Sequence, residues 1–288
     1  MADREPKRNN DPPVVEDDGL YLPTIRPHSL EKIRLHNRYA EIFTSSMRNK
    51  WPQLSYIGLY SGAGRARVEG ANEIVETSAI SVLRQPHRFT HYIYVDNNEA
   101  CTAALEARCR IAAPQANVTV LRRDVNESAP EVLRALPPYG PKNGLLSFCF
   151  IDPFDTSLRF STIRALSHLR IDFLVLLMTG ADFRRNIARY LADPTSTRIE
   201  DLIDCPTWRS EFRKDGNALR FGLGKFADAM QRIGYAGPVS EPVYVSGKKV
   251  LLYNLVFYSK ATAAVRLWKK TTKSLERRRL QANFDFTD

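Results

Sequence analysis

Short apolar runs alternate along the chain with stretches whose apolar residues recur at helical spacing. Each run ends in a polar or glycine-containing segment, as strands buried in a sheet do. The runs expected to be strands are 55–60, 91–96, 117–124, 145–152 and 172–178. The stretches expected to be helices are 29–49, 78–84, 98–112, 127–136, 161–168 and 219–233. This alternation predicts an α/β fold with a doubly wound, mostly parallel, Rossmann-like sheet.

Two further runs predict an antiparallel hairpin at the carboxyl end of the domain. They cover 239–245 and 250–258 and flank Ser246-Gly247-Lys248-Lys249. Outside the alternating part, 65–77 has no clear period and is expected to be a loop. We divide the chain into a disordered or draped arm, a domain with an irregular insertion or lid, and a basic helical tail. Their ranges are 1–28, 29–260 with the insertion at 193–216, and 261–288.

The charge of the chain points to a polyanionic partner. Lysine and arginine number 42 against 32 acidic residues, a net charge of +10. Nucleic acid, DNA or RNA, is the usual partner of such a protein, although a basic surface without a partner is the alternative. The longest apolar runs are too short to cross a bilayer, and the amino terminus lacks the apolar core of a signal peptide. We therefore expect a cytoplasmic protein.

Cysteine and histidine do not predict a metal site. The four cysteines contain no C-x-x-C pair and are expected to be reduced and mostly buried. The five histidines are scattered, without metal-ligand spacing, and surface or capping positions are expected for each. The sequence also lacks the Gly-x-Ser-x-Gly elbow of hydrolases and the P-loop of nucleotide-hydrolysing enzymes.

A glycine-containing turn follows the first expected strand. Tyr60, Ser61, Gly62 and Gly64 lie in this turn, where glycine permits positive φ and lets a ligand approach the backbone. Such a turn at the carboxyl end of a strand is a common cofactor site in α/β proteins. The fingerprint of a dinucleotide site is incomplete because Arg67 stands where its third glycine would be.

Acidic residues close the next two expected strands. Asp96 is placed to accept hydrogen bonds from ribose hydroxyls, and Asp124 from the adenine amine, of S-adenosylmethionine. Either one alone could be a surface or capping carboxylate. Together, at successive strand ends after the glycine turn, they predict cofactor binding.

The fourth expected strand ends in a candidate catalytic segment, Asp152-Pro153-Phe154. The carboxylate can accept from an exocyclic amine, proline fixes the turn, and the aromatic ring can stack on a base. The alternative is a simple strand end. Arg184 and Arg185, after the fifth strand, are the expected substrate contacts, and the basic tail could bind phosphates or be a solvated helix face.

Several of these segments resemble the three-Cys-motif partner (TcmP) family of class I S-adenosylmethionine-dependent methyltransferase-like proteins. The resemblance covers roughly 30–260. It is carried by 31–43, Tyr56-Ile57-Gly58-Leu59-Tyr60-Ser61-Gly62-Ala63-Gly64, Thr77-Ser78-Ala79, Phe150-Ile151-Asp152-Pro153-Phe154 and 180–184. It implies a methyltransferase that acts with a three-cysteine-motif protein.

The chain departs from the family pattern at positions that matter for activity. Gly58 replaces the family's strand-end acid, which helps to hold the methionine end of the cofactor, and Thr77-Ser78-Ala79 replaces a small-Ser-Pro triplet. Related base-amine methyltransferases carry Asp-Pro-Pro-aromatic, whereas the aromatic residue here comes one place earlier. We expect methylation of a nucleic acid on a base. The alternatives are an inactive methyltransferase-fold subunit that binds a partner or nucleic acid, and a nicotinamide oxidoreductase.

Overall fold

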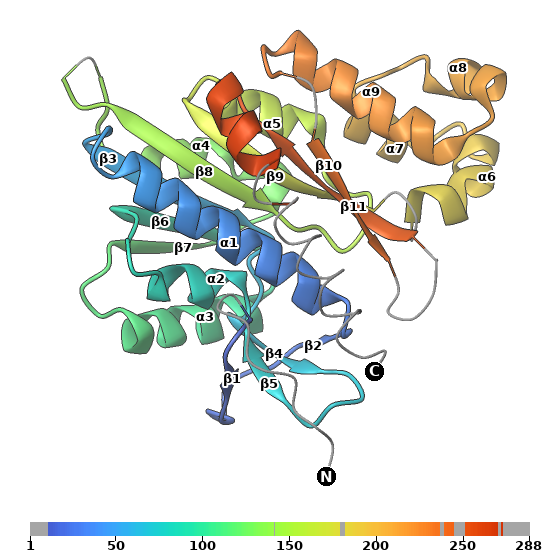
Figure 1. Ribbon diagram of the computed structural model, residues 1–288. Helices are drawn as coiled ribbons and strands as arrows, with labels where there is room; N and C mark the ends of the chain where they lie inside the picture. Colours follow the sequence, from blue (N-terminus) through green and yellow to red (C-terminus); the bar gives the residue numbers. More distant parts are fainter. Residues whose placement is uncertain are drawn as a thin grey trace, which may run out of the picture.

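The computed structural model describes residues 11–140, 142–178, 182–236, 239–244, 251–269 and 272. Its largest element is a seven-stranded sheet of order β10-β11-β9-β8-β3-β6-β7 (Figure 1). The strands β3, β6, β7, β8 and β9 run parallel, and β11 pairs antiparallel with both β9 and β10. The predicted fold class, a doubly wound, mostly parallel sheet with a carboxyl-terminal antiparallel hairpin, is confirmed.

The strands of this sheet begin and end close to the expected positions. They are β3 (Gln53–Leu59), β6 (His91–Asp96), β7 (Val118–Arg122), β8 (Leu145–Ile151), β9 (Ile171–Leu177), β10 (Val239–Tyr244) and β11 (Leu251–Tyr258). The central strands β3 and β8 are almost wholly buried, because helices cover both faces of the sheet. The expected turn of the hairpin, 246–249, lies outside the described residues.

Helices pack on the two faces of the sheet in separate layers (Figure 1). One face carries α1 (Ser29–Met47), α2 (Ser78–Ser81), α3 (Glu99–Ala112) and the helical residues 262–269. The other carries α4 (Ala129–Ala135), α5 (Phe160–Leu166), α7 (Arg198–Ile203), α8 (Trp208–Asp215) and α9 (Ala218–Arg232). The short 3₁₀ helices are η1 (Val82–Arg84) and η2 (Val125–Glu127). The part of the basic tail beyond residue 272 lies outside the described residues.

Two segments expected to be irregular form regular structure. The expected loop 65–77 contains the hairpin β4 (Arg65–Val68) and β5 (Ile74–Glu76). The expected irregular segment 193–216 contains α7 and α8, whose buried apolar residues, Trp208 among them, join the core. Both elements are short, and their apolar residues are too few to give a clear period in the sequence.

The amino-terminal segment adds two strands to the β4–β5 hairpin. β1 (Val14–Val15) pairs with β5, and β2 (Thr24–Ile25) pairs with β4, so that a small four-stranded sheet forms beneath the main one (Figure 1). From Asp11 to His28 the arm therefore lies against the domain. Residues 1–10 of the expected arm lie outside the described residues.

Buried polar side chains fix α1 on the sheet. His36 is fully buried and hydrogen-bonds through Nε2 to the Tyr56 hydroxyl, 2.9 Å away, so the expectation of a surface or capping histidine is wrong here. Burial lowers the pKa of His36 to about 4. The Tyr39 hydroxyl donates to Asp172 Oδ2 at 2.9 Å. Cys101, Cys109 and Cys149 are buried free thiols, as predicted.

We expect Asp172→Asn to stabilise the protein in a pH-dependent way. Burial raises the pKa of Asp172 from 3.8 to about 6, so the folded state resists ionisation of this carboxyl group. The unfavourable charge is absent below about pH 4 and fully present above pH 6, where it costs about 3 kcal/mol. Urea unfolding should therefore show the variant gaining stability over the wild type at pH 7.5 and little at pH 4. An equal difference at both pH values would contradict this account.

Candidate functional site

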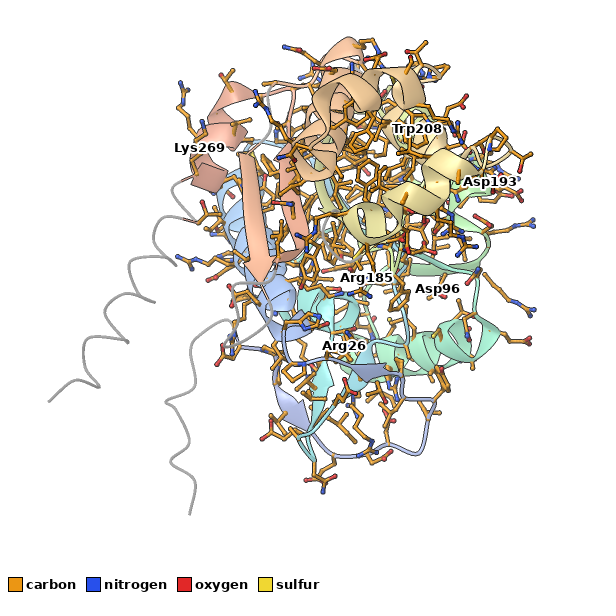
Figure 2. All side chains as sticks on the ribbon, turned by 90° about the vertical axis from the view of Figure 1, so that its right-hand side faces the viewer. Arg26, Asp96, Arg185, Asp193, Trp208 and Lys269 are labelled. Atoms are coloured by element: carbon orange, nitrogen blue, oxygen red, sulfur yellow. The ribbon has the colours of Figure 1, made fainter. Side chains whose placement is uncertain are left out.

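The sheet reverses its strand order at the carboxyl ends of β3, β6 and β8. From β3 the chain moves outward through β6 to β7, and then crosses back to β8 on the other side of β3. In open α/β sheets, ligands bind at this point of reversal. Figure 2 views the molecule from this side and shows Asp96, Arg26 and Arg185 there. The predicted glycine turn, Asp96 and Asp152 thus come from three adjacent strand ends.

The turn after β3 has three residues with positive φ: Tyr60 at 60°, Gly62 at 63° and Gly64 at 81°. A Cβ atom on Gly64 would lie 2.7 Å from Ile80 Cγ1 and 2.9 Å from Leu105 Cδ1, so α2 and α3 exclude any side chain there. A Cβ atom on Gly62 would meet nothing within 4 Å. Gly64 therefore allows the turn to pack on the helices, whereas Gly62 faces open space that a ligand can occupy.

Asp96 links this turn to the next helix. Its side chain is 7% exposed. Oδ2 accepts a hydrogen bond from the Gly62 backbone N–H at 2.8 Å, and Oδ1 accepts from the Asn98 backbone N–H at 2.9 Å. A carboxylate has about four acceptor positions, so each oxygen can accept one more bond. The carboxylate is thus held rigidly at the end of β6 and can accept hydrogen bonds from two hydroxyl groups.

The other residues expected near the cofactor are placed differently. Asp124 lies two residues beyond β7 and is exposed, and its Oδ1 accepts from the Asn126 backbone N–H at 2.7 Å to cap η2. Ser61 is buried and donates from Oγ to the Gly58 carbonyl oxygen at 2.8 Å, which fixes the turn. Tyr60 is half-buried, and burial raises its pKa to about 12.

Other side chains fill the space beside Gly58, the position at which the TcmP family has an acidic residue. A Cβ atom on Gly58 would lie 2.9 Å from Ser61 Oγ, 3.1 Å from Tyr94 Cδ1 and 3.3 Å from Tyr56 Cε1. The Tyr94 hydroxyl donates to the Ala79 carbonyl oxygen at 2.7 Å and is held there. Local packing therefore leaves no room for a carboxylate at this strand position.

Asp152 forms an ion pair that the sequence analysis did not anticipate. Lys32 Nζ, from the first turn of α1, lies 2.8 Å from Asp152 Oδ1 and 2.7 Å from Oδ2. Both side chains are 16% exposed. The Asp152 backbone N–H donates to the Leu59 carbonyl oxygen at 3.2 Å, so this segment lies beside the glycine turn. A cation-paired carboxylate is a poorer acceptor for an incoming amine than a free one.

A cavity of about 430 Å³ opens beside this ion pair. Its walls come from β2, α1, the segment after β8, β9, α6 (Arg184–Ala192) and β11. The lining residues are Thr24, Ile25, Arg26, His28, Ser29, Lys32, Pro153, Phe154, Asp155, Leu176, Met178, Asp182, Arg185 and Tyr253. The volume is within the usual range for sites that bind small molecules or one nucleotide.

The lining of this cavity includes exposed aromatic and basic side chains. Phe154 is 75% exposed. The Arg185 side chain is exposed and forms no ion pair with the described residues, and Arg26 has only a long contact, 3.8 Å, with Glu69. Arg184, although exposed on the same helix, does not appear in the described lining. The structure thus brings Pro153, Phe154 and Arg185 together, but not Arg184.

The amino-terminal arm is fastened to the glycine turn by Arg108 of α3. The Arg108 side chain is 2% exposed, and its guanidinium donates to both Asp18 oxygens, at 2.8 and 2.7 Å. It also donates to the Ala63 carbonyl oxygen at 2.6 Å and the Tyr21 carbonyl oxygen at 3.0 Å. Hydrogen bonds from Arg108 hold the pKa of Asp18 down, at about 2. One buried cation therefore joins the arm, the turn and α3.

The sequence analysis missed Lys32, Arg108 and Asp18 as parts of the site. Lys32 lies in the 31–43 segment that carries part of the family resemblance, which was the available signal. Nothing in the sequence distinguishes Arg108 or Asp18 from other surface charges. Among the described residues, no group of His, Cys, Asp or Glu is placed to hold a metal ion. None of their helices has the length and apolar character that crossing a bilayer requires.

No family model and no curated protein matches the sequence. Solved structures are similar in fold at low identity. The O-methyltransferase from Bacillus cereus in complex with SAH is 11% identical, with a TM-score of 0.46 over 78% of this chain and 80% of that one. Protein LPL1258 from Legionella pneumophila is 9% identical, with a TM-score of 0.45 over 83% of this chain and 90% of that one. An rRNA methylase from Streptococcus thermophilus is 8% identical, with a TM-score of 0.37 over 78% and 93%. The fold assignment itself rests on the strand order.

Proposed function

We propose that the protein is an S-adenosylmethionine-dependent methyltransferase that acts on a nucleic acid. The observation that carries this proposal is the convergence of the Gly62–Gly64 turn, Asp96 and Asp152 at the point where the sheet reverses its strand order. A cofactor site and an acceptor cavity then lie side by side, as methyl transfer between two bound molecules needs.

The described residues fit S-adenosylmethionine. Asp96 offers a fixed carboxylate for the ribose hydroxyls, and the space in front of Gly62 admits the methionine end against the backbone. Tyr60, Ser61 and Gly64 shape this turn, and Asp124 can reach an adenine amine from the end of β7. The cofactor would supply an electrophilic methyl group, so the protein's own task is to hold the acceptor in line with it.

Charge and stacking surface favour a nucleic acid as the acceptor. Arg26 and Arg185 line the cavity with guanidinium groups, which suit phosphate oxygens, and Phe154 offers an exposed ring for a base. Arg184 and Arg189 extend the exposed basic surface along α6. With Pro153 fixing the turn, Lys32, which is paired with Asp152, would contact the reacting base.

The resemblance to the TcmP family adds a possible partner, a three-cysteine-motif protein, that would complete substrate binding. A second candidate function is an inactive subunit of the same fold. Two observations favour it: the filled position at Gly58 and the occupied carboxylate of Asp152. An inactive subunit would bind its partner or nucleic acid equally well with or without Asp152.

A labelled-methyl assay tests the proposal. The full chain is incubated with S-adenosyl-[methyl-³H]methionine and total DNA, tRNA or rRNA, with and without the candidate partner. We expect label in one class of nucleic acid, and its loss in Arg26→Ala/Arg185→Ala. Label in none of them, with cofactor binding retained, would support the inactive subunit. Binding of NAD(P)H in place of S-adenosylmethionine would indicate the oxidoreductase alternative.

A further inference from the structure

The side chain that faces the acceptor cavity from the Asp152 ion pair is the lysine and not the carboxylate. The described lining of the cavity includes Lys32, Pro153 and Asp155, but not Asp152. Lys32 Nζ contacts both oxygens of Asp152, at 2.8 and 2.7 Å. The ammonium group therefore stands between the carboxylate and the space that the acceptor would occupy.

An ammonium group can only donate hydrogen bonds. It has three N–H donors and no acceptor, and its contact with Asp152 is shared between the two carboxylate oxygens. This leaves N–H donors for a bound molecule. An exocyclic amine next to this group would place two hydrogen-bond donors against each other. A carbonyl oxygen would instead accept a hydrogen bond from the ammonium group.

The ion pair is not easily opened to expose the carboxylate. Both partners are only 16% exposed, and the two contacts give Lys32 a fixed direction along the cavity wall. Removing either charge from such a site leaves the other without compensation. The pair thus presents one positively charged group that donates hydrogen bonds, the Lys32 ammonium group, to the molecule that accepts the methyl group.

We infer that Lys32 determines base specificity, and that its ammonium group selects an acceptor base with a carbonyl oxygen at C6 of a purine or C4 of a pyrimidine. This inference rests on the proposed function. Guanine carries such an oxygen at C6 and uracil or thymine at C4, whereas adenine and cytosine carry amines at the equivalent positions. Asp152 is then a positioning residue that orients Lys32, rather than the acceptor for a target amine.

Other walls of the cavity are compatible with one nucleotide in this orientation. Phe154 offers its ring at the mouth, while Tyr253 is buried and held by a hydrogen bond from its hydroxyl to the His28 carbonyl oxygen at 3.2 Å. Arg26 and Arg185 come from two different elements and can contact the flanking phosphates. A base between these walls would place its pairing edge toward Lys32.

Matched octanucleotides test this inference. Each is a fluorescently labelled octamer of abasic nucleotides with a base at one variable position only: inosine or adenosine, uridine or cytidine. The members of each pair differ by an oxo or amino group on the pairing edge and by the ring nitrogen beside it, which carries a hydrogen only in the oxo member. Binding to the full chain saturated with S-adenosylhomocysteine is measured by anisotropy. We expect at least tenfold tighter binding of the oxo member in both pairs.

The variants assign that preference to one side chain. Lys32→Met should reduce the preference to less than twofold, while Lys32→Arg retains it. The double variant Lys32→Met/Asp152→Asn should show the same reduced preference as Lys32→Met. This double variant also lacks the unpaired carboxylate that could affect folding of the single variant. Lys50→Met, in the exposed turn that follows α1, should leave the preference unchanged.

Two different failures can be told apart. Equal or tighter binding of the amino members, or a preference that survives Lys32→Met, would overturn the role of Lys32 while leaving nucleic-acid binding intact. Absence of binding to every octamer and to long RNA and DNA, with S-adenosylhomocysteine still bound, would overturn the proposed nucleic-acid substrate and this inference with it.

Discussion

Asp18→Ala is expected to lower the free energy of unfolding by about 3 kcal/mol, because it leaves the Arg108 guanidinium buried without its carboxylate. Arg108 is 2% exposed and donates hydrogen bonds to both oxygens of Asp18. The same change should weaken binding of S-adenosylhomocysteine at least about tenfold, because Arg108 also holds the Ala63 carbonyl oxygen inside the glycine turn. Urea unfolding and calorimetric titration measure the two effects.

Asp17→Ala is the matched control for this change. Asp17 belongs to the same arm and pairs with Arg67 at 3.0 Å, but the two side chains are 50% and 42% exposed. An exposed pair of this kind contributes about 0–1 kcal/mol. If Asp17→Ala and Asp18→Ala destabilise the protein equally, or if neither affects the ligand, the arm is not joined to the turn through Arg108.

The second prediction separates the two glycines of the turn. Gly64→Ala should destabilise the protein by about 3 kcal/mol, because its Cβ atom would overlap Ile80 and Leu105 in addition to the strain of φ at 81°. Gly62→Ala should cost only about 1 kcal/mol, since its Cβ atom meets nothing within 4 Å. Thermal and urea unfolding of the two variants give this comparison directly.

For ligand binding, Gly62→Ala is the informative variant. The methyl group of Gly62→Ala projects into the space that the cofactor would occupy, so the affinity for S-adenosylhomocysteine should fall at least about tenfold in a protein that remains folded. A Gly62→Ala variant that binds the ligand as the wild type does would mean that the cofactor does not approach this turn.

The fold could be predicted from the sequence because the strands of the main sheet are buried on both faces. Runs such as 145–151 are nearly continuous in apolar residues, and the helices between them repeat their apolar positions regularly. The small sheet could not be predicted in the same way. Its strands are two to four residues long, and β1 and β2 are joined to β4 and β5 only by contacts distant in sequence.

The candidate site was predictable only where its residues follow a strand directly. The positions of Gly62, Gly64, Asp96 and Asp152 follow from the rule that parallel strands end at one edge. The partner of Asp152 could not be predicted, because Lys32 is 120 residues away and meets it only through the packing of α1 on the sheet. Arg108 reaches the arm across 90 residues for the same reason.

The central claim is that the protein binds S-adenosylmethionine at the carboxyl ends of β3 and β6 through Asp96. Calorimetric titration of the full chain with S-adenosylmethionine and S-adenosylhomocysteine, repeated on Asp96→Asn with its folding checked by circular dichroism, tests it most directly. The account predicts micromolar binding by the wild type and at least about a hundredfold weaker binding by the folded variant. A folded wild-type protein that binds neither compound, or a variant that binds both as well as the wild type, would contradict it.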